Sequence, residues 1–274
     1  MSVFKRLNHI LTPHAFSLLL TAGAVNVGMF ALIVRYARLD VFASRPLLSL
    51  KTILNGNRTD AWAMMAYFII LVVCYGIGWW AVRKLHGPAV WAAVVIVALF
   101  SGFVLLFVYP YAAADIYDYI GHARISGVYG ANPFVQVINN YPNDPFYAYA
   151  YWKTDPSTYG PAWELVAAPV ARLAGDGVIA TTIAFKLLAG SFLLLTLAAL
   201  GGFLSHVARE RALTAVLLLA WNPIVLFESF GMGHNDFAMV LWLILAAWAI
   251  AKRHYTLSIL ALAAGVLFKF IPLL

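Results

Sequence analysis

Long uninterrupted apolar runs recur along the chain, and they constrain its fold more than any other feature. A helix needs about 20 mostly apolar residues to cross the hydrocarbon core of a membrane. Six runs reach or approach that length: about 15–34, 61–82, 89–109, 178–205, 211–229 and 236–251. A seventh begins near Leu257 and is still apolar at the last residue, so we expect the chain to be truncated at its C-terminus. The pattern predicts an all-α, polytopic transmembrane helix bundle of about seven spans.

The composition supports lipid as the surrounding solvent. Of the 274 residues, 64% are hydrophobic and 11% are charged, whereas a soluble domain carries about 25% charged residues. The formal net charge is +7, but Lys and Arg gather at the ends of apolar runs, where they orient a membrane protein. We therefore expect a multi-pass protein of the inner (cytoplasmic) membrane, surrounded by membrane lipids and without a nucleic-acid partner. The single cysteine, Cys74, excludes a disulfide within the chain.

Basic residues in three short connections predict the orientation of the bundle. The pairs are Arg83 with Lys84, Arg209 with Arg211, and Lys252 with Arg253. Positively charged connections stay on the cytoplasmic side, so the long loop 110–177 is expected outside. Within it, the apolar stretch 161–173 is short and contains Pro169, which favours an interfacial helix over a crossing. Segment 35–60 would also lie outside although it is rich in Arg and Lys, which the positive-inside rule disfavours.

The outer loop holds the strongest candidates for catalysis, Asp115 and Asp118. Both follow the end of an apolar run, and a carboxylate is costly in lipid, so both should face water or a cavity. Their spacing of three places them on one side of a helical turn. One of them can then act as a general base while the other orients it or a substrate hydroxyl. The alternative is an N-cap, since an Asp before a helix caps its exposed N–H groups.

Further polar residues interrupt apolar sequence. The segment 231–236, GMGHND, precedes an apolar run on the predicted outer side. There His234 and Asp236 are candidates to join the carboxylates of the outer loop, although Asp236 alone also fits an N-cap. Lys269, within the last apolar run, is a candidate to pair with an anionic lipid headgroup. Snorkelling to the interface is the alternative, and Lys186 has a similar but weaker case.

The remaining patterns carry less functional information. The segment 159–163, YGPAW, places Pro161 at the expected start of the interfacial helix. Aromatic rings can stack on sugars, but Tyr and Trp are common at membrane interfaces anyway. The sequence has no Walker motif and no H-E-x-x-H, and its scattered histidines, His122, His206 and His254, lack metal-ligand spacing.

In their order, the motifs are similar to those of a known family. The series comprises Asp115, Asp118, Tyr119 and Arg124; Gly130, Asn132, Pro133 and Phe134; Tyr159, Gly160, Pro161 and Trp163; Trp221, Asn222 and Pro223; the run 233–236; and Lys269, Phe270 and Pro272. It resembles the GT-C superfamily of membrane glycosyltransferases, in particular bacterial polyprenyl-phosphate-mannose-dependent (α-1,6-)mannosyltransferases of the cell envelope. The resemblance implies N-terminal spans in 1–88 and a GT-C-like catalytic module in 89–274. The large extracytoplasmic loop 110–177 would bear juxtamembrane helices.

The resemblance also implies a reaction. The protein would transfer a sugar, expected to be mannose, from a polyprenyl-phosphate donor to a glycan or glycolipid acceptor on the outer face. Asp115 would be the base in an inverting mechanism, with Asp118 beside it, and Arg124 or Lys269 would neutralise the departing phosphate. The residues expected to bind substrate are Tyr119, Arg124, Tyr159, His234, Asn235, Asp236 and Lys269. The lipid-linked donor is a co-substrate; no cofactor or metal ligand is predicted, and divalent metal dependence is left open.

A membrane transporter or lipid-linked-sugar flippase is the competing class, because intramembrane Lys and Asp also mark transport pathways. A transporter should show internal repeats or paired broken helices in two halves, and the sequence shows no such repeat. A non-catalytic scaffold would not explain why Asp115, Asp118, His234 and Asp236 occur together.

Overall fold

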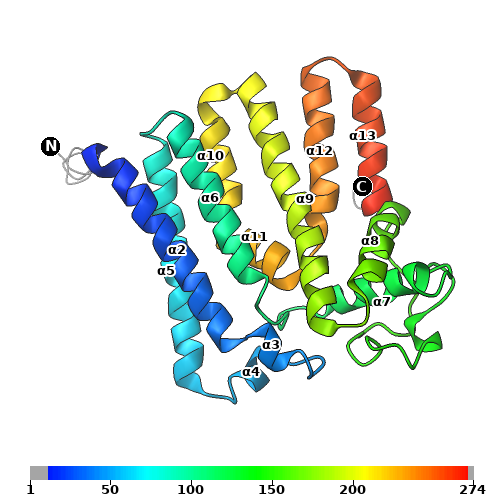
Figure 1. Ribbon diagram of the computed structural model, residues 1–274. Coiled ribbons are helices and arrows are strands. Elements are labelled where there is room, and N and C mark those ends of the chain that lie inside the picture. Colours follow the sequence, from blue (N-terminus) through cyan, green and yellow to red (C-terminus); the bar gives the residue numbers. More distant parts are fainter. Residues whose placement is uncertain (1–11, 271–274) are drawn as a thin grey trace.

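The protein is a bundle of antiparallel helices with a group of shorter elements at one end (Figure 1). The computed structural model describes residues 12–270, so Pro272 and the last residues of the seventh apolar run lie outside the described part. All regular elements between these residues are helices, as predicted. Four helices are long and apolar enough to cross a membrane. They are α2 (Ala15–Tyr36), α5 (Arg58–Val82), α6 (Pro88–Leu105) and α9 (Val178–Val207).

The predicted number of about seven spans is not confirmed. The run 211–229 is broken into α10 (Arg209–Ala220) and a second piece bent by 55° from it, α11 (Pro223–Leu226) with the π-helical η3 (Phe227–Met232). The break follows from chemistry, because Pro223 disfavours helical backbone before it. Asn222 then caps the new helix by accepting from the backbone N–H of Ile224 at 3.0 Å.

The last two apolar runs also form helices, but short ones. The helix α12 (Asp236–Ala251) has 16 residues and α13 (Tyr255–Phe268) has 14. At 1.5 Å per residue, neither reaches the length of about 20 residues that a perpendicular crossing requires. The structure therefore has four candidate spans, or five if the bent pair is one span.

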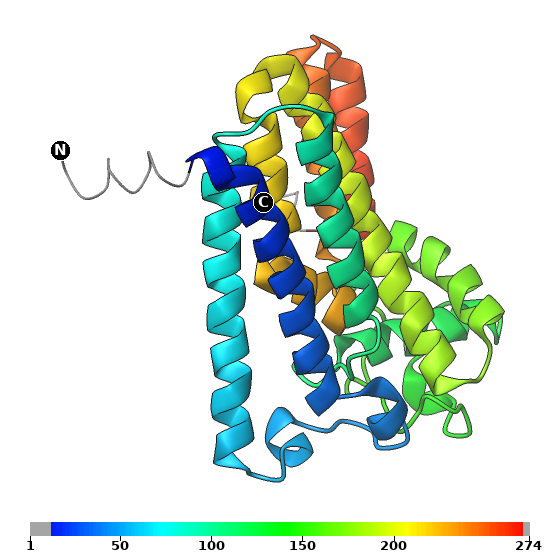
Figure 2. The ribbon, with the colours of Figure 1, turned by 60° about the vertical axis from the view of Figure 1, so that its left-hand side comes forward.

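The two ends of the bundle differ in what connects the helices. The connections α5–α6, α9–α10 and α12–α13, which carry the three basic pairs, lie together at what we call the basic end (Figures 1 and 2). At the opposite, loop end lie segment 37–57, with α3 (Leu39–Phe42) and α4 (Leu50–Ile53), and segment 106–177. The latter contains α7 (Asp115–Gly127), η2 (Ile138–Asn140) and α8 (Pro161–Ala174). This shared placement agrees with the predicted topology, while the assignment of the loop end to the outer face stays a prediction.

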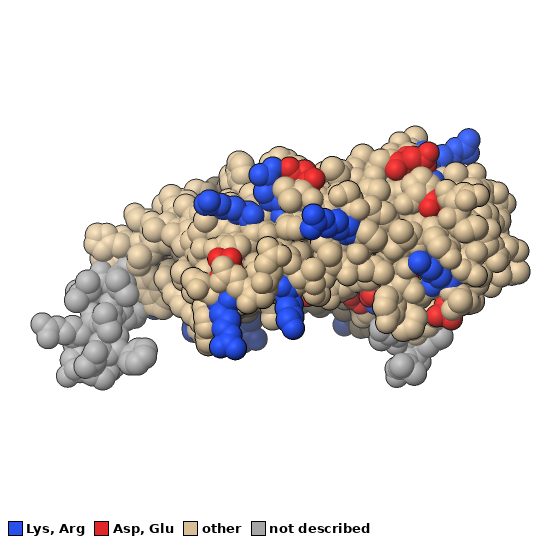
Figure 3. All heavy atoms as spheres, turned by 90° about the horizontal axis from the view of Figure 1, so that it is seen from below, with Lys and Arg blue, Asp and Glu red and all other residues tan. Residues whose placement is uncertain are grey.

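The basic segment at 35–60 is fastened to the loop end by tyrosine hydroxyl groups. Tyr149 donates to the carbonyl oxygen of Ala43 at 2.7 Å, and Tyr109 donates to that of Arg45 at 2.9 Å. Figure 3 shows charged side chains of both signs scattered over the face seen from this end. These contacts place segment 35–60 at the same end of the bundle as the loop 110–177, and which side of the membrane that end faces stays a prediction.

Helix α8 has the features predicted for an interfacial helix. It begins at Pro161 as predicted, has 14 residues and contains Pro169. Leu165 and Leu173 are 76% and 87% exposed, which suits a helix whose apolar face rests on lipid. Its other face crosses α7 closely, since a Cβ on Gly127 would lie 2.3 Å from the carbonyl oxygen of Ala168.

Two buried clusters hold the helices together. The larger joins α2, α5, α6 and α10 around Trp221, which is fully buried and donates to the carbonyl oxygen of Val94 at 3.0 Å. Gly23 and Gly78 make room for this ring, because a Cβ on either would lie within 3.2 Å of it. The second cluster joins α7, α8, α9, α12 and α13 at the loop end. This second cluster brings the polar residues of distant segments to one place.

Candidate active site

Asp115 and Asp236 each begin a helix at the loop end, but neither is an N-cap. The N-cap of α7 is Ala114 and that of α12 is Asn235, and neither helix has a side-chain capping bond. The alternative role considered for both carboxylates is therefore wrong. Each stands in a first helical turn, where the helix dipole favours negative charge, and its carboxylate is directed to other partners.

Asp115 meets His234, which lies more than a hundred residues further along the chain. The carboxylate of Asp115 is 3.6 Å from Nε2 of His234, and Nδ1 of His234 donates to Glu228 at 2.7 Å. Glu228 lies in the π-helical η3, a kind of turn frequent at functional sites. Gly233 has φ +80°, and a Cβ there would lie 2.5 Å from Ile116. Only glycine permits this turn to approach α7 so closely.

The charges of this cluster set its protonation. Burial alone would lower the pKa of His234, but hydrogen bonding and the negative charges of Asp115 and Glu228 outweigh it and raise the pKa to about 9. The imidazole of His234 in turn lowers the pKa of Asp115. At neutral pH the cluster therefore holds an imidazolium ion between two carboxylates.

Lys269 completes the polar surface beside this cluster. Helix α13 ends at Phe268, so Lys269 is extended and lies outside the helix rather than within a span. Its ammonium group is 2.5 Å from Asp236 and 5.9 Å from the ring centre of Tyr159. The ion pair gives the ammonium group a protein partner, while its pairing with a lipid headgroup and its snorkelling to the interface both stay predictions.

A cavity of about 300 Å³ opens next to Asp115. Its lining residues come from the first turns of α7 and from segment 152–159: Asp115, Asp118, His122, Trp152, Asp155, Pro156, Thr158 and Tyr159. Carboxylates, a hydroxyl and aromatic rings around a small cavity suit a polar ligand with an apolar face, as a sugar ring has. The spacing argument for Asp115 and Asp118 is thus confirmed, since both line the same cavity.

Asp118 is the buried member of the pair. One of its oxygens accepts from the backbone N–H groups of Tyr151 at 2.9 Å and Trp152 at 3.0 Å. The other has no hydrogen-bond partner among the described residues. Burial raises the pKa of Asp118 to about 6, against the lowering effect of the two N–H groups. Asp118 therefore fixes the far wall of the cavity, while Asp115, 43% exposed, is accessible at its edge.

Segment 155–160 is itself held in place from two sides. Ser157 donates to the buried carboxyl group of Glu164 at 2.5 Å, and burial raises the pKa of Glu164 to about 7. Gly160 donates to the carbonyl oxygen of Phe268 at 3.1 Å. A Cβ on Gly160 would lie 2.0 Å from the carbonyl oxygen of Leu267. The close approach at Gly160 is what brings Tyr159 beside Lys269.

Two basic residues considered as functional candidates, Arg124 and Lys186, have structural partners. Arg124, 2% exposed, donates to Asp144 and to Asp176, each at 2.7 Å. The structure thus does not bring Arg124 to the cavity, because its guanidinium is bound by carboxylates on another side of α7. Lys186 is fully buried and donates to the carbonyl oxygen of Leu106 at 3.3 Å, beyond the end of α6.

Tyr119 and Asn235 lie beneath the site rather than in it. Tyr119 is buried and packs edge-on against Tyr159, with ring centres 4.7 Å apart. Asn235 is 3% exposed, and its side-chain oxygen has no partner among the described residues. Tyr119 therefore supports the ring of Tyr159, and Asn235 lies between His234 and Asp236.

The sequence analysis missed Glu228, Asp155 and His122. Glu228 is the single acidic residue in the apolar run 211–229. An ionisable residue in such a run is a functional candidate, and this signal could have identified it. His122, set aside as scattered, follows Asp118 by four residues and therefore shares its face of α7. Across residues 12–270, no group of three or more His, Cys, Asp or Glu side chains is arranged to hold a metal ion.

The loop end gathers ionised side chains around a small cavity. This arrangement is typical of a membrane enzyme, whereas a scaffold protein needs no such site. Residues 12–274 match the family described as alpha-(1->6)-mannopyranosyltransferase, N-terminal domain. The chain belongs to this family and is a membrane glycosyltransferase, as the resemblance implied. The match includes α2 and α5 as well as residues 89–274. The family supports the transferase and not the competing transporter or flippase.

No curated protein and no solved structure matches the chain.

Proposed function

We propose that the protein transfers mannose from a polyprenyl-phosphate donor to a hydroxyl group of a glycan or glycolipid acceptor at the outer face of the membrane. The observation that carries the proposal is the meeting of Asp115 and His234 at 3.6 Å beside a cavity of about 300 Å³. The imidazolium of His234 keeps Asp115 ionised, so its carboxylate is free to accept the proton of an attacking hydroxyl as that oxygen bonds to carbon.

The transfer proceeds as a single displacement. Asp115 takes the proton of the acceptor hydroxyl as its oxygen bonds to the anomeric carbon, and the bond from that carbon to the phosphate oxygen breaks. The configuration inverts because attack and departure occur on opposite faces. Polyprenyl phosphate leaves as an anion, so no acid is required, unlike in hydrolysis of an ordinary glycoside.

The charges around Asp115 suit the departing phosphate. His234 is protonated at neutral pH, and Lys269 approaches the same region from α13. Two cations in a partly water-excluded site stabilise developing negative charge more than they would in water. Lys269 and His234 therefore take the role that Arg124, bound elsewhere, does not fill. The lipid-linked donor is the only co-substrate in the proposal.

The donor is tested with purified protein in proteoliposomes. We expect transfer of radiolabelled mannose to an α-mannoside acceptor from polyprenyl-phosphate mannose and not from GDP-mannose. Transfer from the nucleotide sugar alone would overturn the donor assignment. The anomeric configuration of the product, read by NMR, checks inversion.

The outer placement is tested by cysteine labelling in a Cys74→Ser background. Asn143 at the loop end and His254 at the basic end are both exposed. We expect an impermeant thiol reagent added to intact cells to label Asn143→Cys and not His254→Cys. The reverse pattern would place the site on the cytoplasmic face and overturn the proposal.

A further inference from the structure

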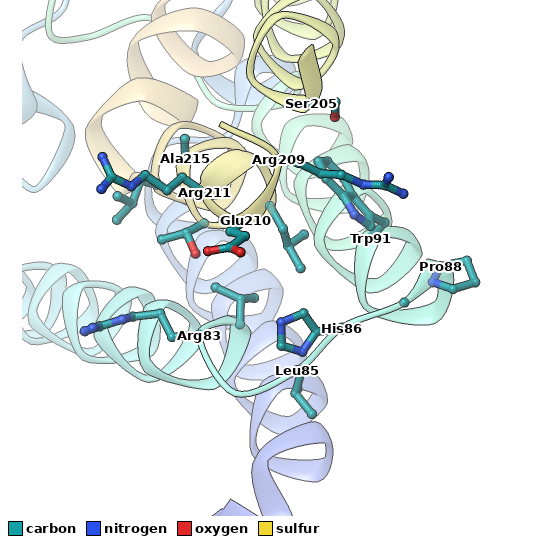
Figure 4. A pocket seen from close by; sticks show the side chains of 15 residues that line it. Arg83, Leu85, His86, Pro88, Trp91, Ser205, Arg209, Glu210, Arg211 and Ala215 are labelled. Carbon is teal, nitrogen blue, oxygen red and sulfur yellow. The ribbon is translucent and has the colours of Figure 1, made fainter. Parts of the chain in front are cut away.

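A second and larger cavity lies at the basic end, away from the candidate active site. It has a volume of about 1160 Å³ and is formed by the end of α5, the start of α6 and the start of α10 (Figure 4). Ser205, near the end of α9, also lines it, so the cavity lies among the helix ends that carry basic connections. None of the residues assigned to mannosyl transfer lines it.

The mouth of this basic-end cavity is positively charged. Arg83 and Arg211 extend along one side and Arg209 along the other, while Glu210 is the single carboxylate in the lining (Figure 4). All three arginines are exposed, and none forms an ion pair with another residue in the described range 12–270. This differs from Arg124 and Lys269 at the loop end, which are both paired.

The wall below the arginines is mainly apolar. It includes Val82, Leu85, Leu213 and Leu218, with the indole of Trp91 at one side. Trp is characteristic of the depth where lipid headgroups begin. A cationic mouth above an apolar wall matches an amphiphile with an anionic head, and basic pockets between membrane helices bind anionic lipid headgroups.

We propose that the basic-end cavity binds an anionic phospholipid, with its phosphate on the side of Arg83 and Arg211 and an acyl chain along Leu213 and Leu218. Arginine suits this ligand because its planar guanidinium binds phosphate oxygens in pairs. The proposal is independent of the sugar donor, because the cavity and Asp115 are at opposite ends of the bundle. The bound lipid anchors the connections α5–α6 and α9–α10 to the membrane surface.

The test is lipid retention, measured by native mass spectrometry on protein exchanged into vesicles of phosphatidylglycerol and phosphatidylcholine in equal parts. We expect the parent protein to retain phosphatidylglycerol preferentially. The double variant Arg83→Gln/Arg211→Gln should reduce that preference by about 30-fold, since each basic residue near the surface contributes about 1 kcal/mol. The matched control, Lys252→Gln/Arg253→Gln, removes the same charge at the same end but outside the cavity, and should retain the preference. If both double variants lose the preference for phosphatidylglycerol equally, the preference reflects general surface charge. That result would overturn the proposed lipid site.

A second variant keeps every charge and fills the space. Thr214 is half-buried in the lining, and Thr214→Trp should also abolish retention. Undiminished retention in Thr214→Trp would overturn the proposal even if the arginine variant fails to fold. Soluble glycerol phosphate should not displace the lipid, because it lacks an acyl chain for the apolar wall. Displacement at equal concentration would show a site for free phosphate instead and would likewise overturn it.

Discussion

The two ends of the helix bundle use charged residues in different ways. At the basic end, Arg83, Arg209 and Arg211 are exposed and form no ion pair with another described residue. At the loop end, the cations Lys269 and His234 are each held by carboxylates. Exposed charge needs only a place in the sequence near a span end, whereas paired charge needs partners delivered by folding. The comparison shows that a few consecutive residues can carry the signal for orientation in the membrane. A catalytic site, by contrast, requires side chains that only folding brings together.

The largest effect is expected when the proposed base at the loop end, Asp115, is neutralised. Asp115→Asn keeps the shape of the side chain and removes its basicity, so mannosyl transfer should fall by about 10²–10⁴-fold. Asp40→Asn changes an exposed carboxylate at the same end and should leave transfer near the parent value. If Asp115→Asn stays active and Asp118→Asn does not, the two carboxylates exchange roles.

Loss of the buried cation at the loop end should lower stability rather than catalysis alone. Arg124→Gln leaves Asp144 buried without its charge partner, at an expected cost of about 3–5 kcal/mol in the free energy of unfolding. Arg253→Gln at the basic end should change it by less than about 0.5 kcal/mol. Thermal unfolding of the two variants in the same detergent measures the difference. Equal midpoints would contradict the structural role of Arg124.

Removal of the cation beside the cavity should weaken donor binding. Lys269→Met keeps length but leaves Asp236 as an unpaired negative charge, so affinity for polyprenyl phosphate should fall about tenfold. Lys252→Met, at the basic end, is the matched control and should bind the donor as the parent does. Unchanged donor affinity in Lys269→Met would assign the phosphate to His234 alone.

The smallest expected effect is a change in the pH profile. The pKa of His234, about 9 in the folded protein, exceeds the usual value of about 6.5. The protonated side chain of His234 therefore adds to the free energy of unfolding in full below about pH 6.5. This stabilisation is lost as the pH rises through about 9. Transfer should also decline on this alkaline limb, as the imidazolium beside Asp115 loses its proton.

The substitution Glu228→Gln tests whether Glu228 sets the pH at which transfer declines. Without the Glu228 charge, the pKa of His234 should fall, and the alkaline limb of transfer should move to lower pH. His234→Gln should remove the limb. A limb at the same pH in Glu228→Gln would show that Glu228 does not set the charge of His234.

Much of the fold was predictable because the relevant information is local. The predicted spans 15–34, 61–82, 89–109 and 178–205 correspond to α2, α5, α6 and α9. The predicted number of about seven crossings is not confirmed, because two of the apolar runs form short helices and a third is bent at a break. The run 211–229 remained apolar across Asn222 and Pro223, yet the residue before proline is restricted to non-helical backbone.

The candidate site was only partly predictable. Asp115 and Asp118 were found because their spacing on a helix is a local property. Arg124 was misplaced because its sequence position, nine residues after Asp115, says nothing of Asp144 and Asp176, which bind it. Glu228 was missed because its contact with His234 could not be inferred from the sequence. The turn at Gly233 brings both residues against α7 only in the folded protein.

The sequence by itself determined that this protein is a helical membrane protein, which connections are basic, and which family it belongs to. Hydropathy and motif order are properties of consecutive residues, so they survive without knowledge of the fold. Only the tertiary structure decided which charges meet. Lys269 pairs with Asp236 of the neighbouring helix α12, and His234 lies beside Asp115, which precedes it by more than a hundred residues in the sequence. Coulomb energy depends on distance through space and not along the chain. Charged residues therefore form a candidate active site at the loop end, and at the basic end they remain exposed as cations that are unpaired within residues 12–270.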